Sequence, residues 1–150
     1  MTALLTEVQT TDKMVKIARE QVDAFNSGDW ERVRAGLASD SHMNELGTER
    51  KVDGPEKIVE LFKGWKQAFP DAAGTVTSAF ASGDKAALEV TWKGTHTGPL
   101  MTAEATIPAS GKRQETPAAI LFTFEGEKIK EARHYFDSMT LFKQIGAQPK

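Results

Sequence analysis

The chain has 150 residues, with 19 lysines and arginines against 21 aspartates and glutamates and a formal net charge of −2. A chain of this length buries roughly 68–70% of its unfolded surface, so we expect one domain over residues 1–150. The near-neutral balance argues against nucleic acid or an anionic membrane as a partner. The sequence has no cysteine, which excludes disulfides, thiolate metal sites and a cysteine nucleophile.

The N-terminus has neither the basic start nor the apolar centre of a secretory signal. No apolar run approaches the ~20 residues that cross a bilayer. We therefore expect a cytoplasmic protein. Residues 1–11 are polar, and we expect them to form a flexible lead-in.

Helical spacing of apolar residues predicts three helices in the first half of the chain. They cover residues 14–25, 30–37 and 55–69. Asp29 is suited to cap the second helix, and Pro55 opens the third at a position where its missing N–H costs nothing. The segment 39–54 is polar and shows no period, which predicts an irregular connection.

After Pro70 the period changes to two, which predicts strands joined by short turns that contain glycine. These strands cover residues 72–82, 85–96, 100–107, 112–125 and 128–137, and a short helix ends near residue 145. Helices followed by hairpins predict an α+β fold, with the helices on one face of a mostly antiparallel sheet.

Four segments, in this order, resemble the SnoaL-like polyketide (ester) cyclases, which are related to the ketosteroid isomerases of the nuclear-transport-factor-2-like superfamily. They span residues 54–71, 90–100, 107–113 and 134–146. The run Trp-Lys-Gly-Thr-His-Thr-Gly-Pro-Leu from Trp92 to Leu100 is the most specific of them. The resemblance implies a cone-shaped α+β barrel, in which three N-terminal helices pack on a curved sheet. This fold supports isomerases, cyclases, hydrolases, dehydratases and ligand-binding proteins, and a homodimer fits each of them.

Asp137 is the first candidate for chemistry. It follows the apolar residues Tyr135 and Phe136, and a carboxylate among aromatic rings loses solvation, so we expect its pKa to be raised toward neutrality. The resemblance implies an acid/base aspartate on the last strand, for which Asp137 is the best match; a register shift would place His134 there instead. The alternative is that Asp137 caps the terminal helix.

Two histidines are candidates to assist. His96 shares a face with Val90 and Trp92, so it points inward, either to orient or polarise a carbonyl substrate or as a hydrogen-bonded core residue. His134 lies three residues before Asp137, and strand alternation places the two on opposite faces unless the strand bulges or ends between them. Its alternative role is a half-buried histidine bonded to a neighbouring strand.

The third histidine, His42, lies in the polar segment and is expected to be exposed. Its neighbours Asn44 and Glu45 are placed to contact a ligand at the mouth of a cavity. The spacing of the three histidines fits no metal motif, so we expect no metal site.

The leading hypothesis is a cofactor-free enzyme that transfers a proton on an apolar carbonyl compound, by aldol-type cyclisation or double-bond isomerisation. Asp137 would be the acid/base, assisted by His134 or His96. The substrate-binding residues would be Trp65, Trp92, Phe122, Tyr135 and Asn44. The alternative is a non-catalytic small-molecule-binding protein of the same fold. It is favoured by Ala118-Ala119-Ile120, where the family pattern sometimes carries a polar catalytic partner. A third hypothesis is a structural or interaction protein.

Overall fold

The computed structural model describes the backbone of residues 2–147 and the side chains of residues 10–147. The helices are α1 (Thr2–Ser27), α2 (Trp30–Ala35), α3 (Pro55–Ala68) and α4 (Ser138–Gln144). The strands are β1 (Leu37–Glu45), β2 (Arg50–Asp53), β3 (Ala73–Ser82), β4 (Lys85–Thr95), β5 (Leu100–Met101), β6 (Thr106–Ile107), β7 (Arg113–Glu125) and β8 (Lys128–Phe136).

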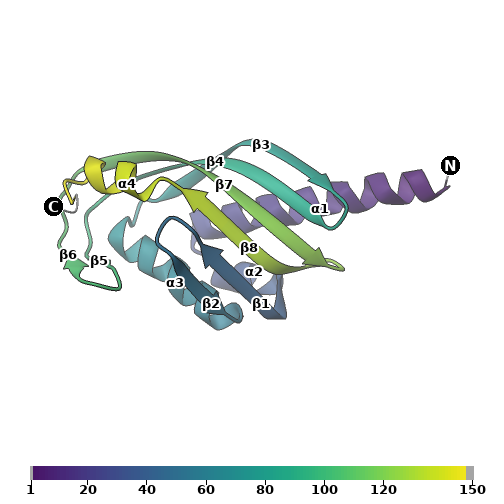
Figure 1. Cartoon of the computed structure of the whole chain (residues 1–150), viewed down its shortest axis with the longest axis horizontal. Coiled ribbons are helices and arrows are strands. Elements are labelled where there is room, and N and C mark those ends of the chain that lie inside the picture. The colour runs from purple at the N-terminus through teal and green to yellow at the C-terminus, as the bar shows by residue number, and fades with distance from the viewer. Residues whose placement is uncertain (1, 148–150) are drawn as a thin grey trace.

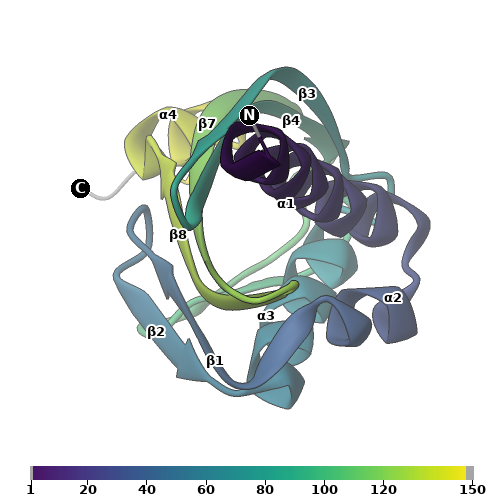
Figure 2. The same cartoon turned by 90° about the vertical axis from the view of Figure 1, so that its right-hand side faces the viewer.

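Six strands form one curved sheet in the order β2-β1-β8-β7-β4-β3. β1 and β8 run parallel, and the other neighbours are antiparallel. The sheet does not close on itself, and α1, α2 and α3 lie on its open, concave side (Figures 1 and 2). The predicted α+β fold, with helices packed on a curved and mostly antiparallel sheet, is confirmed.

The core lies between the concave face of the sheet and the two long helices α1 and α3. The apolar stripes predicted for these helices face inward, and the inward positions of β4 and β7 meet them. This cluster includes Met14, Ala18, Val22, Ile58, Leu61, Leu88, Val90, Ile120 and Phe122. A second cluster continues it toward α4 and contains Phe25, Ala68, Phe69, Leu100, Leu141 and Ile145. The packing leaves room between the two clusters, where the site described below is found.

The first helix, predicted over residues 14–25, begins earlier than expected, because α1 starts at Thr2. Met1 lies outside the described residues, and the flexibility of residues 1–11 stays a prediction. The segment from Thr2 to Thr11 has no glycine or proline to interrupt a helix, although four of its ten residues are threonine. In the part of the chain that the structure describes, no helix is both long and apolar enough to cross a membrane.

The irregular connection predicted over residues 39–54 was wrong, because β1 and β2 lie there and precede α3. The buried positions of β1 include Ser41 and Glu45 beside Met43. Because these two residues are polar, the sequence of β1 shows no alternation of apolar and polar residues. His42 is therefore a strand residue, and its Nε2 lies 2.8 Å from Oε2 of Glu131 on β8. The single strand predicted over residues 100–107 is instead the short pair β5 and β6, which forms a separate sheet.

Gly98 allows the turn after β4 to approach the end of α3. Its N–H donates to the carbonyl of Ala68 at 3.1 Å, and a Cβ atom at Gly98 would lie only 1.9 Å from the carbonyl oxygen of Gln67. Gly64, inside α3, has open space around the corresponding position. We expect Gly98→Ala to lower the free energy of unfolding by about 1–3 kcal/mol.

The control, Gly64→Ala, is expected to raise the free energy of unfolding by about 0.5–1 kcal/mol, because alanine favours a helix interior. Urea unfolding of the two variants measures both changes. Equal effects at the two positions would contradict the close approach at Gly98.

Candidate functional site

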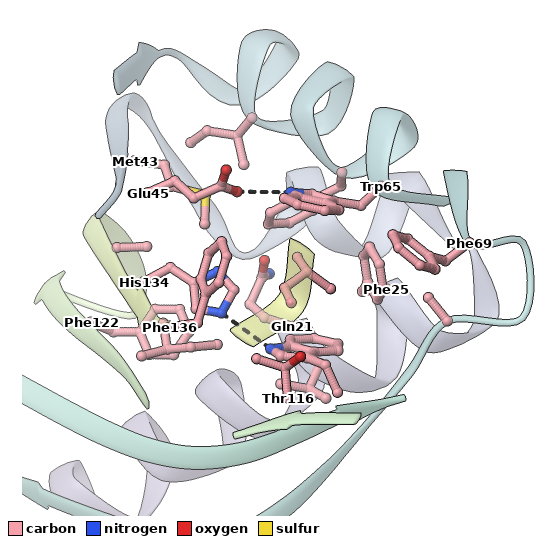
Figure 3. A pocket seen from close by; sticks show the side chains of 18 of the residues that line it. Gln21, Phe25, Met43, Glu45, Trp65, Phe69, Thr116, Phe122, His134 and Phe136 are labelled. Atoms are coloured by element: carbon pink, nitrogen blue, oxygen red, sulfur yellow. Dashed lines mark hydrogen bonds between the residues drawn. The ribbon is translucent and has the colours of Figure 1, made fainter. Parts of the chain in front are cut away.

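An apolar cavity of about 100 Å³ lies between the concave face of the sheet and helices α1 and α3 (Figure 3). Aromatic side chains form much of its wall. They are Phe25, Phe62, Trp65, Phe69, Trp92, Phe122 and Phe136. Ligand pockets for drug-sized molecules measure roughly 300–1,000 Å³, so in this conformation the cavity suits a compact molecule.

Three of the five predicted substrate-binding residues, Trp65, Trp92 and Phe122, line the cavity. Asn44 and Tyr135 do not, because each alternates along its strand with residues that face inward. Tyr135 is 39% exposed, and the guanidinium of Arg133 lies 5.7 Å from the centre of its ring. Tyr135 lies near the end of the last strand, as predicted, but on the face that points away from the cavity. Asn44 was predicted in an irregular connection and instead lies on β1, also facing away from the cavity.

Asp137 lies outside the cavity and is exposed to solvent. It is the N-cap of α4, and its carboxylate accepts hydrogen bonds from the backbone N–H of Thr140 at 3.2 Å and from the Thr140 hydroxyl at 2.6 Å. These bonds lower the pKa of Asp137, the hydroxyl contributing most. The expected raised pKa was wrong, because β8 ends at Phe136 and the chain turns outward before the carboxylate.

His96 is fully buried and also lies outside the cavity. Its Nδ1 accepts a hydrogen bond from the N–H of Ser110 at 3.2 Å, and its ring packs at 5.2 Å from that of Phe69. Burial lowers the pKa of His96. These contacts correspond to the alternative in which His96 is a core residue.

His134 lines the cavity from β8 and is the only one of the three predicted catalytic residues that does so. Its Nε2 accepts a hydrogen bond from the indole N–H of Trp92 at 3.1 Å, drawn as a dashed line in Figure 3. Burial lowers the pKa of His134 to about 4, against an opposing effect of the Glu45 carboxylate. His134 is therefore neutral at pH 7.

Glu45 supplies a buried carboxylate beside His134. The parallel pairing of β1 with β8 places the two residues opposite each other, and both line the cavity (Figure 3). The side chain of Glu45 is only 1% exposed. From the sequence, Glu45 was expected to contact a ligand at the mouth of the cavity, whereas the structure places it in the cavity wall.

Four donor groups hold this carboxylate in one orientation. Oε1 accepts hydrogen bonds from Nη2 of Arg50 at 2.8 Å, from Nε of Arg50 at 3.2 Å and from the hydroxyl of Thr48. Oε2 accepts one from the indole N–H of Trp65 at 2.8 Å. Oε1 accepts three of these bonds and Oε2 only one, so Oε2 is the oxygen with acceptor capacity left for a molecule in the cavity.

Three further polar residues of the cavity wall, Gln21, Gln114 and Thr116, were missed from the sequence. Gln21 falls on the apolar stripe of α1, and its amide donates to the carbonyl of Val33 at 3.1 Å. Gln114 and Thr116 have the same strand parity as Ile120, and the Thr116 hydroxyl donates to Gln114 Oε1 at 2.6 Å. These three residues could have been found from the sequence, because each is a polar residue at a position where the helix or strand period predicts a core residue.

The described residues contain no group of three or more histidine, aspartate or glutamate side chains that could hold a metal ion. What the site does contain is a carboxylate held by an ion pair and a neutral imidazole, both in an apolar enclosure. Such a pair is suited to moving a proton and to stabilising the charge that results.

Solved structures place this architecture in a class with the ketosteroid isomerase-like fold. A protein of that fold from Catenulispora acidiphila, solved with trimethylamine, is 19% identical with a TM-score of 0.74, covering 89% of this chain and 93% of its own. A candidate SnoaL-like polyketide cyclase from Jannaschia sp. CCS1 is 20% identical with a TM-score of 0.83, covering 93% and 96%. An LEH-like epoxide hydrolase from M. tuberculosis is 18% identical with a TM-score of 0.68, covering 90% of each chain.

At these identities the structures establish the fold alone. The family model for the SnoaL-like polyketide cyclases matches residues 15–145. The chain therefore belongs to the SnoaL-like polyketide cyclase family. No curated protein sequence matches it significantly.

Proposed function

We propose that the protein is an enzyme that moves a proton next to the carbonyl group of a compact apolar compound, using only its own side chains. The observation that supports this is the placement of the Glu45 carboxylate and the neutral His134 in one apolar cavity. The volume of about 100 Å³ favours a compact substrate.

In the proposed reaction, Oε2 of Glu45 takes a proton from the carbon next to the carbonyl. The C–H electron pair moves into the new carbon–carbon double bond, and the carbonyl oxygen becomes an enolate that accepts a hydrogen bond from the His134 ring. The enolate then takes the proton back from Glu45 at another carbon, which shifts a double bond. Alternatively its carbon attacks a second carbonyl, which closes a ring, and the new alkoxide takes the proton from Glu45. The apolar wall strengthens the hydrogen bond to the enolate because it excludes water.

The second candidate is a protein that binds a compact apolar molecule without turning it over. Two observations favour it. The carboxylate of Glu45 already accepts four hydrogen bonds, and residues 118–120 of β7 carry no polar side chain.

Deuterium exchange distinguishes the two candidates without knowledge of the natural substrate. The purified protein is incubated in D2O with a panel of compact ketones, including cyclic 1,3-diketones and β,γ-unsaturated cyclic ketones. NMR follows both deuterium uptake next to the carbonyl and the binding of each compound. We expect uptake well above that in buffer for at least one compound. Binding without uptake would favour the second candidate, and neither binding nor uptake across the panel would contradict both.

A further inference from the structure

The hydrogen bond between Trp92 and His134 spans a whole strand of the sheet. Trp92 lies on β4 and His134 on β8, and β7 runs between these two strands. On β7, Thr116 is opposite Trp92 and Ile120 is opposite His134. The bond therefore passes over the level of Ala118, which lies midway between these two positions of β7.

Alanine at position 118 is what leaves this path open. Ala118 has the inward parity of Thr116 and Ile120, and it is paired with Val90 on one side and with Phe136 on the other. Its side chain is a single methyl group, so the indole can pass over it to the imidazole. A longer side chain at position 118 would occupy the space between the two rings.

This hydrogen bond decides which nitrogen of His134 carries the proton. The indole N–H can only donate, so Nε2 of His134 must accept and is unprotonated. A neutral imidazole with a bare Nε2 carries its proton on Nδ1. In the described part of the chain, Nδ1 of His134 makes no hydrogen bond. It is also not one of the fully buried polar atoms, so its N–H is accessible to a bound molecule.

We propose that Trp92 is a positioning residue that holds His134 as the Nδ1–H tautomer, so that a carbonyl oxygen in the cavity meets a hydrogen-bond donor. In the opposite tautomer Nδ1 would present a lone pair to that oxygen and repel it. The consequence for catalysis rests on the proposed function. The assignment of the tautomer does not, because it follows from the contact between the two side chains.

The tautomer is measured by long-range proton–nitrogen NMR of the ¹⁵N-labelled protein near pH 7, without any ligand. In the wild type we expect the signal of Nδ1 to be of the protonated type and that of Nε2 to be of the unprotonated type. In Trp92→Phe, which retains an aromatic ring but has no N–H, we expect a large share of the Nε2–H form. A wild type protonated at Nε2, or a folded Trp92→Phe with an unchanged tautomer, would overturn the proposal.

Two further variants separate the contact from a general disturbance of the cavity. Trp65→Phe removes the indole N–H of the second tryptophan that lines the cavity, which donates to Glu45 and not to His134, so His134 should keep the wild-type tautomer. Ala118→Leu changes neither partner but fills the path between them, so it should give the same shift as Trp92→Phe. If Trp92→Phe does not fold, Ala118→Leu carries the test, and an unchanged tautomer in that variant would refute the proposed path.

The exchange assay then measures the effect on the reaction. We expect Trp92→Phe to lower the exchange rate about tenfold to a hundredfold, as a misplaced catalytic group does, with a smaller change in substrate binding. If the wild type shows no exchange with any ketone, the proposed function fails while the NMR result still decides the tautomer. If exchange occurs and Trp92→Phe retains the full rate, the positioning role is refuted.

Discussion

Replacing Glu45 by glutamine is expected to lower the rate of deuterium exchange by about 10²- to 10⁴-fold, the usual contribution of a general base. Glutamine has nearly the same shape and can still accept the hydrogen bond from the indole of Trp65, but it cannot take a proton from the substrate. Binding of the same ketone, followed by NMR, should change much less than the rate.

The matched control is Asp137→Asn. Asp137 is the carboxylate that the sequence favoured, but it is exposed and lies outside the cavity. Asparagine caps helices about as well as aspartate, so this variant should retain both fold and exchange rate. Loss of exchange in Asp137→Asn together with full exchange in Glu45→Gln would reverse the assignment of the base.

Replacing Arg50 by methionine is expected to lower the free energy of unfolding by about 3 kcal/mol, because it leaves a buried carboxylate without its counter-ion. Arg50 donates two hydrogen bonds to Glu45, and its guanidinium lies 5.5 Å from the centre of the Trp65 ring. Urea unfolding at pH 7 measures the loss.

Arg34→Met is the control for removing an arginine. Its partners Glu31 and Glu56 have side chains 86% and 73% exposed, so water replaces the lost bonds and the stability should change much less. A second check combines Arg50→Met with Glu45→Gln, which removes both charges. This pair should regain most of the stability lost by Arg50→Met alone, and a purely additive result would contradict the ion pair as the cause.

The parts of the fold that could be predicted from the sequence are those whose inward positions are apolar. α3 begins at Pro55 as expected, and β4 and β7 follow their alternation of apolar and polar residues. β1 could not be predicted in this way, because its buried positions include Ser41 and Glu45. Homodimer formation and a cytoplasmic location stay predictions.

Only part of the site could be predicted from the sequence, namely the residues that a local pattern or the family resemblance marks. Trp65 and Trp92 were identified because each is an aromatic side chain on a predicted inward face, and His134 because it lies in a segment that resembles the family's last strand. Glu45 was noted only as a contact at the mouth, since its place beside His134 depends on the parallel pairing of β1 with β8. No local pattern marks a pairing between the first strand and the last.

That pairing also determines when during folding the site can appear. Glu45 belongs to the first strand of the sheet and His134 to the last, so neither an early hairpin nor a chain that stops before β8 contains both groups. Contacts between distant parts of a chain form slowly, because the chain loses entropy on closing a long loop before the contact contributes any stabilising free energy. We therefore expect the site to be assembled late, so that gain of the proposed exchange activity during refolding would report that the final strand has docked rather than that the chain has collapsed.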